Sequence, residues 1–131
     1  MLLYKSLTEN IIGAFYDVHA QLGPGLLEKP YRNALMLALM KRGLAVTKEQ
    51  QFDVCFDGMS IGKYFADIVV EDKVVLEIKA VRELDGDMMA QVINYLNISG
   101  LPVGILVNFR NATVTFRRFE NRSPNYLSSL E

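Results

Sequence analysis

The first forty residues carry two apolar patterns with helical spacing. Apolar side chains recur every three or four positions over residues 7–21 and again over residues 31–39, which predicts two helices. Ser6 and Glu9 have the spacing of a capping box at the start of the first helix. A Gly-Pro-Gly segment at residues 23–25 interrupts the pattern, so the two helices are expected to meet at a sharp corner.

Single residues mark the start and the end of the second helix. Pro30 fits only its first turn, because deeper in the helix it would remove a backbone hydrogen bond. Gly43 is expected to end the helix. Glu28 therefore lies at the helix N-terminus, where the helix dipole favours a carboxylate.

From residue 51 the pattern changes to a period of two, which is typical of strands. Asp57-Gly58 then supplies a hairpin turn. The following strand is predicted over residues 59–70, the next turn over residues 71–73, and a returning strand over residues 74–80. These segments predict a sheet built from neighbouring hairpins.

The rest of the chain predicts three more elements and a tail. They are an amphipathic helix begun by Asp85 or Asp87 and ended by Gly100, a buried strand over residues 102–108, an edge strand over residues 113–119, and a loosely attached tail over residues 120–131. The helix is expected to pack on the sheet. The whole chain, residues 1–131, is predicted to form one domain.

Composition narrows the class of protein. The chain has 131 residues, half of them apolar, which is enough to bury a core without disulfides. The single cysteine, Cys55, excludes an internal disulfide and a cysteine-rich metal centre. Without a signal peptide or a membrane-spanning run, a cytoplasmic protein is expected. The net charge of -1 argues against a simple DNA-binding module, although an enzyme can carry positive charge locally.

Three charged residues, Asp67, Glu77 and Lys79, stand inside otherwise apolar strands. A buried carboxylate is usually paired, neutralised or bound to a metal, because leaving it alone is costly. A three-residue turn would pair Val70 with Val74 and place Asp67 opposite Glu77, with Lys79 on the same face. A two-residue turn would instead put Asp67 on the other face.

Two facing carboxylates need compensation, because like charges opposite one another destabilise a sheet. A divalent cation bound by Asp67 and Glu77 would provide it, with Lys79 offsetting charge beside the site. The alternative is an ion pair of Lys79 with one of the carboxylates on an exposed sheet face. The spacing alone leaves both interpretations open.

A wider set of motifs resembles a known family. Asp67 and the tripeptide Glu77-Ile78-Lys79 follow the segment Gly25-Leu-Leu-Glu28-Lys-Pro-Tyr31, and the similarity extends over residues 6–119. This set resembles the GxxExxY protein family, a branch of the PD-(D/E)xK nuclease-like superfamily. The resemblance implies that Asp67 and Glu77 bind magnesium. It further implies that Lys79 activates water and stabilises negative charge, and that Glu28 adds to the metal site.

Two further residues fit this resemblance. Gln91 and Tyr95, four apart on the third helix, are similar to the Gln-x-x-x-Tyr element of RecB-like members. Their structural alternatives are a loop hydrogen bond for Gln91 and packing on the sheet for Tyr95. The helix dipole is likewise a plain explanation for Glu28. The chain departs from the family at Phe65, where an arginine commonly precedes the Ala-Asp dipeptide, and at Pro30, which shortens the second helix.

The resemblance implies both a fold and a function. The fold is an α/β domain of restriction-endonuclease-like type, with a central mixed β-sheet flanked by helices and the charged site at the sheet edge. The function is a Mg2+-dependent nuclease, with Mn2+ as a substitute, that hydrolyses phosphodiester bonds of nucleic acid, DNA before RNA. The alternative is a catalytically silent nuclease-fold domain in nucleic-acid binding or protein assembly. Because one small subunit offers little surface for a DNA interface, a homodimer is also considered.

Overall fold

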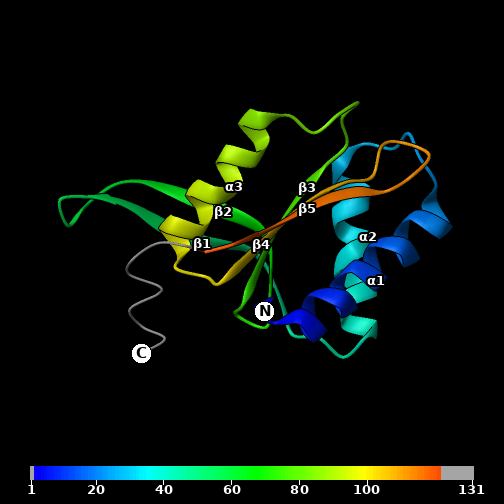
Figure 1. The fold of residues 1–131 in the computed structure, drawn as a ribbon, viewed down its shortest axis with the longest axis horizontal. Coiled ribbons are helices and arrows are strands. Elements are labelled where there is room, and N and C mark those ends of the chain that lie inside the picture. Colours follow the sequence, from blue (N-terminus) through cyan, green and yellow to red (C-terminus); the bar gives the residue numbers. More distant parts are fainter. Residues whose placement is uncertain (1, 122–131) are drawn as a thin grey trace.

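Within residues 2–121, which the computed structural model describes, three helices flank a mixed five-stranded sheet (Figure 1). The elements are α1 (Lys5–Leu22), α2 (Glu28–Lys41), β1 (Val46–Phe56), β2 (Met59–Val70), β3 (Val74–Lys79), α3 (Gly86–Ser99), β4 (Val103–Asn108) and β5 (Thr115–Glu120). The strands lie side by side in chain order. Only β3 and β4 are parallel, because α3 carries the chain back between them. This confirms the predicted α/β architecture.

Different helices cover the two faces of the sheet (Figure 1). Leu76 of β3 packs in the buried cluster that contains Phe15 of α1, together with the inward residues of α2. Val75 packs with Leu96 of α3 in a second cluster. Gly104 of β4 lets α3 approach, because a Cβ at this position would lie 2.9 Å from a valine methyl group of the helix. No helix of the described residues is long and apolar enough to cross a bilayer.

The turns and the third helix cap follow the predictions. Asp57 and Gly58 join β1 to β2, and both have positive φ, at 50° and 77°, as a two-residue hairpin turn requires. Val70 pairs with Val74, which confirms the three-residue turn between β2 and β3. Asp85 caps α3 by accepting a hydrogen bond from a backbone N–H in the first turn. The hairpin register on which the site prediction depends is therefore confirmed.

Two predictions near the ends of the chain are wrong. Ser6 lies inside α1, whose N-cap is Tyr4 without a side-chain hydrogen bond, so Ser6 and Glu9 form no capping box. Glu120 ends β5, and Asn121 is buried and donates hydrogen bonds to backbone carbonyls in and just after α3. The first two residues of the predicted tail therefore belong to the fold, and the remainder lies outside the described residues.

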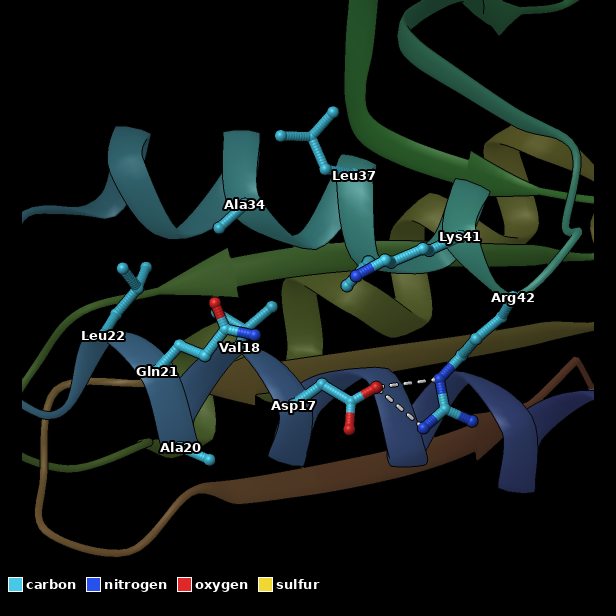
Figure 2. A pocket seen from close by; sticks show the side chains of 10 residues that line it. Asp17, Val18, Ala20, Gln21, Leu22, Ala34, Leu37, Lys41 and Arg42 are labelled. Carbon is cyan, nitrogen blue, oxygen red and sulfur yellow. Dashed lines mark hydrogen bonds and ion pairs between the residues drawn. The ribbon is translucent and has the colours of Figure 1, made fainter.

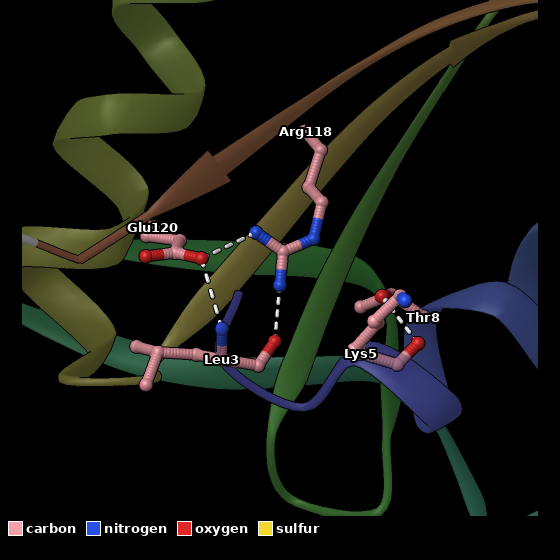
Figure 3. A network of polar contacts seen from close by, with 5 residues as sticks. All are labelled: Leu3, Lys5, Thr8, Arg118 and Glu120. Carbon is pink, nitrogen blue, oxygen red and sulfur yellow. Dashed lines mark hydrogen bonds and ion pairs between the residues drawn. The ribbon is translucent and has the colours of Figure 1, made fainter. Parts of the chain in front are cut away.

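A contact with β5 explains the early start of α1 (Figure 3). The carboxylate of Glu120 accepts hydrogen bonds from the Leu3 N–H at 3.0 Å and from Arg118 at 2.7 Å. Arg118 also donates to the Leu3 carbonyl. These bonds fix the chain immediately before Lys5, so the helix begins there rather than at the predicted capping box.

Tyr31 holds the corner between α1 and α2. Its hydroxyl donates to the Gly23 carbonyl at 2.6 Å and accepts from the Leu26 N–H at 3.1 Å. Its fully buried ring stacks on Phe109 with the ring centroids 5.0 Å apart. Tyr31 is thus a core residue, and it positions the first turn of α2, which carries Glu28.

Removing the Tyr31 hydroxyl tests this role. Tyr31→Phe keeps the stacked ring but leaves the two backbone groups of the corner without their partner, so the free energy of unfolding is expected to fall by about 1 kcal/mol. Urea denaturation measures the change. Tyr16→Phe is the control, because Tyr16 is 52% exposed on α1. A loss for Tyr31→Phe no larger than the control's would show that the hydroxyl does not hold the corner.

Candidate active site

The candidate site forms where β2 and β3 part. Their pairing ends at Ile68↔Leu76. Beyond this pair β3 continues along β4 as far as Lys79, while β2 continues along β1. At the point of separation, Oδ2 of Asp67 accepts a hydrogen bond from the Ile78 N–H at 3.0 Å. The Asp67 side chain therefore binds a backbone donor of the neighbouring strand.

This location corrects the expected position at the sheet edge. β3 is the middle strand of five and β2 is also internal, so the edges are formed by β1 and β5. The parallel strand β4 extends the sheet beyond β3, which the hairpin pattern did not indicate. The charged residues are consequently buried or half-buried rather than spread along an open edge.

Glu77 is the most deeply buried acid of the site, with 8% of its surface exposed. Its Oε1 accepts a hydrogen bond from the Tyr64 hydroxyl at 2.5 Å. Burial, followed by repulsion from Asp67, raises the pKa of Glu77 to about 7. The Tyr64 hydrogen bond and the positive charge of Lys79 oppose this rise. Glu77 thus carries an electrostatic strain that a cation would relieve.

Glu28 approaches the same charges from α2. Partial burial and the charge of Asp67 raise the pKa of Glu28, whereas Lys79 and Arg32 lower it. The fold therefore brings Glu28, Asp67, Glu77 and Lys79 into one electrostatic group, although they come from three different elements. Whether each performs the role expected of it stays a prediction.

The donor set fits a divalent cation. Asp67 and Glu77 offer carboxylate oxygens, which are the ligands that Mg2+ takes while it keeps several waters. Within residues 2–121, no three side chains of His, Cys, Asp or Glu are grouped so that they alone could hold a metal ion. The two central carboxylates therefore fit an ion that retains part of its water shell, and Glu28 as a third ligand stays a prediction.

An aromatic stack borders Glu77. The ring of Tyr64 lies 3.8 Å from that of Tyr95 on α3 and 6.1 Å from that of Phe52 on β1, measured between centroids. Burial and then the charge of Glu77 raise the pKa of both tyrosines, so both hydroxyls stay protonated at neutral pH. Tyr95 packs beside the site. Gln91 is exposed one turn earlier on α3, and its role stays a prediction.

Two residues of the site, Tyr64 and Arg32, were not predicted from the sequence. Tyr64 looks like any strand aromatic in the period-two pattern. Arg32 follows Glu28 by four positions, a spacing that places both on one face of α2 and was the available signal. Its Nη1 lies 3.9 Å from Oδ1 of Asp67, and its Nη2 lies 3.5 Å from Oε1 of Glu49.

A separate cavity lies between α1 and α2 (Figure 2). Its volume is about 690 Å3, and its walls are formed by Asp17, Val18, Ala20, Gln21, Leu22, Ala34, Leu37, Ala38, Lys41 and Arg42. Asp17 and Arg42 pair with one another at 2.8 Å at its rim. Because these residues are not those of the charged group, the cavity is distinct from the candidate active site.

The raised pKa of Glu77 predicts pH-dependent stability of the metal-free protein. The folded side chain holds its proton up to about pH 7, whereas the unfolded one loses it near 4.5. The free energy of unfolding should therefore fall between these values as the pH rises, by on the order of 3 kcal/mol. Glu77→Gln, which stays neutral, should lose this dependence and be more stable than the wild type above pH 7 in EDTA.

Urea denaturation across this pH range measures the effect. Glu83→Gln at an exposed position is the matched control and should keep the wild-type pH dependence. If Glu77→Gln and the wild type lose stability in parallel, Glu77 is not the group responsible.

Tyr64 should tune the same carboxyl group. Tyr64→Phe removes the hydrogen bond that lowers the pKa of Glu77, so this pKa should rise further, by about one unit. Carbon NMR titration of the Glu77 carboxyl group measures it. Tyr95→Phe removes the neighbouring hydroxyl while retaining the stack and serves as the control. An equal shift in both variants would contradict a specific role for the Tyr64 hydrogen bond.

Solved structures with a similar fold include a nuclease. The crystal structure of SSO0001 matches with a TM-score of 0.59 and 19% identity, over 76% of this chain and 53% of that one. The alkaline exonuclease LHK-Exo from Laribacter hongkongensis matches with a TM-score of 0.55 and 15% identity, over 78% and 58% of the two chains. Its complex with dAMP gives the same values. The chain thus spans somewhat over half the length of these neighbours, and at such identities the likeness concerns the fold.

The family comparison covers nearly the whole described chain. No curated protein matches the sequence of this chain. A model of the PD-(D/E)XK nuclease superfamily matches residues 5–119, a span that contains Glu28, Asp67, Glu77 and Lys79. The match confirms the superfamily, while the GxxExxY branch within it stays a prediction. On this match, the chain belongs to the PD-(D/E)XK nuclease superfamily.

Proposed function

We propose that this domain is a divalent-cation-dependent nuclease that hydrolyses phosphodiester bonds, with Mg2+ as its cation, Mn2+ as a substitute, and DNA preferred to RNA. The observation that carries the proposal is the buried Glu77 carboxylate, which burial and the negative charge of Asp67 destabilise and the positive charge of Lys79 stabilises. Such a pair of acids is costly to the folded protein, and a function that uses a cation accounts for it. The segment from Gly25 to Tyr31 supports assignment to the GxxExxY branch.

Phosphodiester hydrolysis needs an activated water molecule and stabilisation of the charge that develops on the phosphate and the leaving oxygen. A bound divalent cation supplies both, by lowering the pKa of a coordinated water and by acting as a Lewis acid. Asp67 and Glu77 are the residues that would hold it. Glu28 is the candidate for a further contact through water.

The chain prepares these two ligands with specific hydrogen bonds. The Ile78 N–H fixes one oxygen of Asp67, and the Tyr64 hydroxyl fixes one oxygen of Glu77. The other oxygen of Asp67, Oδ1, forms the longer contact with Arg32, and each carboxylate oxygen has a second lone pair with which it can bind a ligand. Lys79, on the same strand as Glu77, carries the positive charge that would orient water and oppose the charge developing on the phosphate.

The structural neighbours support nucleic acid as the substrate class. LHK-Exo is named as an alkaline exonuclease, and one of its structures contains dAMP. The present chain covers 58% of that protein, so end-dependent cleavage is not carried over with the fold. Gln91 and Tyr95 on α3 are proposed to contact or support the substrate. Tyr95 stacks on Tyr64, whose hydroxyl is bonded to Glu77.

One observation favours the alternative of a catalytically silent nucleic-acid-binding or assembly domain. Among the described residues, no third carboxylate completes the pair into a preformed metal cage. A homodimer, which would enlarge the DNA interface, also stays a prediction. Phe56 and Met59, which flank the β1–β2 turn, are 67% and 72% exposed and offer it apolar surface.

Cleavage assays with matched variants test the catalytic proposal. Asp67→Asn, Glu77→Gln and Lys79→Met should each lower the cleavage rate at least about 100-fold, because each removes an interaction required in the transition state. Single-stranded DNA, duplex DNA and RNA are incubated with Mg2+, Mn2+ or EDTA. Glu83→Gln and Lys41→Gln, at exposed positions, control for the change of charge.

Calorimetric titration of Mn2+ separates the proposal from its alternative. Asp67→Asn and Glu77→Gln should weaken Mn2+ binding, while Lys79→Met should leave it largely unchanged. Equal cleavage by the wild type and Lys79→Met would indicate a contaminating nuclease. Binding of nucleic acid without cleavage under every condition would favour the silent domain.

A further inference from the structure

We propose that Arg32 binds a phosphate group of the nucleic acid at this site, an inference that rests on the proposed function. Arg32 comes from the first half of α2 and reaches the carboxylates from the helix that also carries Glu28. Its side chain is largely buried, with 18% exposed. The chain therefore places a guanidinium group next to the candidate cation ligands.

The hydrogen-bonding capacity of Arg32 is largely unused in the folded protein. Its Nε is buried and has no hydrogen-bond partner among the described residues. Its Nη atoms lie 3.9 Å from Asp67 and 3.5 Å from Glu49, which is longer than a charge-assisted hydrogen bond. Buried polar groups are normally paired, so a side chain with five N–H donors and an orphaned Nε points to an absent acceptor.

The carboxylates of Asp67 and Glu49 hold Arg32 in place without using all of its N–H donors. Glu49 has a positive φ of 54° and lies between the pairs Lys48↔Ile68 and Gln50↔Ala66, so its backbone is level with Asp67. Arg32 bridges these neighbouring acids. Each Nη atom carries two N–H groups, so one ion pair at each Nη leaves N–H groups for a second acceptor.

A phosphate group matches the donors that remain. Arginine binds phosphate through two parallel N–H···O bonds, whereas lysine acts as a point charge. Lys79 is therefore the better candidate to stabilise the negative charge that develops during cleavage. Arg32 is the better candidate to bind and position the intact phosphodiester. The chain as a whole carries a net charge of -1, so local groups of this kind have to provide the attraction for nucleic acid.

Binding measurements without cleavage test the inference. Fluorescence anisotropy follows a labelled DNA oligonucleotide in Ca2+ at several salt concentrations, with a gel to verify that it stays intact. Arg32→Gln should weaken binding at least about tenfold and reduce the slope of log K against log salt by roughly 0.7 to 0.9, the loss of one phosphate contact. Lys41→Gln removes the same charge from an exposed position at the far end of α2 and should keep the wild-type slope.

A conservative variant separates the hydrogen-bonding geometry of the guanidinium group from its positive charge. Arg32→Lys keeps a cation beside Asp67 and Glu49, so it should fold, retain the salt slope and still bind severalfold more weakly. If Arg32→Gln does not fold, the DNA affinity of Arg32→Lys tests the inference in its place. Manganese titration gives an independent readout: Arg32→Gln should bind Mn2+ at least as tightly as the wild type, because it removes a competing partner of Asp67.

The outcomes distinguish this inference from the proposed function. Wild-type affinity and slope in a folded Arg32→Gln would overturn the inference alone, even if its thermal stability falls, since a purely structural role predicts that combination. A reduced slope in Arg32→Gln, with no cleavage by the wild type, would support phosphate binding and overturn catalysis. A wild type that neither binds nor cleaves nucleic acid would overturn both.

Discussion

The arrangement of this domain depends on two carboxylates kept together where two strands separate. The Asp67 side chain accepts a hydrogen bond from the Ile78 N–H, and β2 and β3 stop pairing at the level of the buried Glu77. A regular hairpin would have continued and left two like charges opposite one another in a closed ladder. By parting here, the strands avoid this closed ladder, while the paired part of the hairpin, around Val75, keeps its packing.

The remainder of the fold holds this opening from both sides. The middle strand β3 stays paired with β4, which fixes Glu77 and Lys79 on a rigid element. From α3, Tyr95 stacks on Tyr64, whose hydroxyl is bonded to Glu77. On the other face, Tyr31 fixes the corner from which α2 starts. The corner before α2, the stack of aromatic rings and the pairing of β3 with β4 therefore position side chains of the site that are distant from one another in the sequence.

The sequence predicted what depends on local period and turn chemistry, and it missed what depends on packing between elements. The three-residue turn, one of the two turns that the sequence allowed, sets the register of the hairpin that leads to Asp67 and Glu77. The helical pattern did not single out Arg32, because its ion pairs with Asp67 and Glu49 depend on how α2 packs against the sheet. Ser6 failed as a cap because a contact with β5, over a hundred residues away, starts the helix earlier.

The charge balance of the site bears on how a nucleic acid would bind there. The charged side chains gathered around it are Glu28, Glu49, Asp67, Glu77, Lys79 and Arg32. Four carboxylates against two cations leave two unpaired negative charges when all are ionised. A nucleic-acid phosphate would be repelled by such a group, whereas a divalent cation would neutralise it. A divalent cation held by Asp67 and Glu77 would therefore reduce the repulsion that a nucleic-acid phosphate meets at this site, and the affinity of the domain for nucleic acid would depend on that cation.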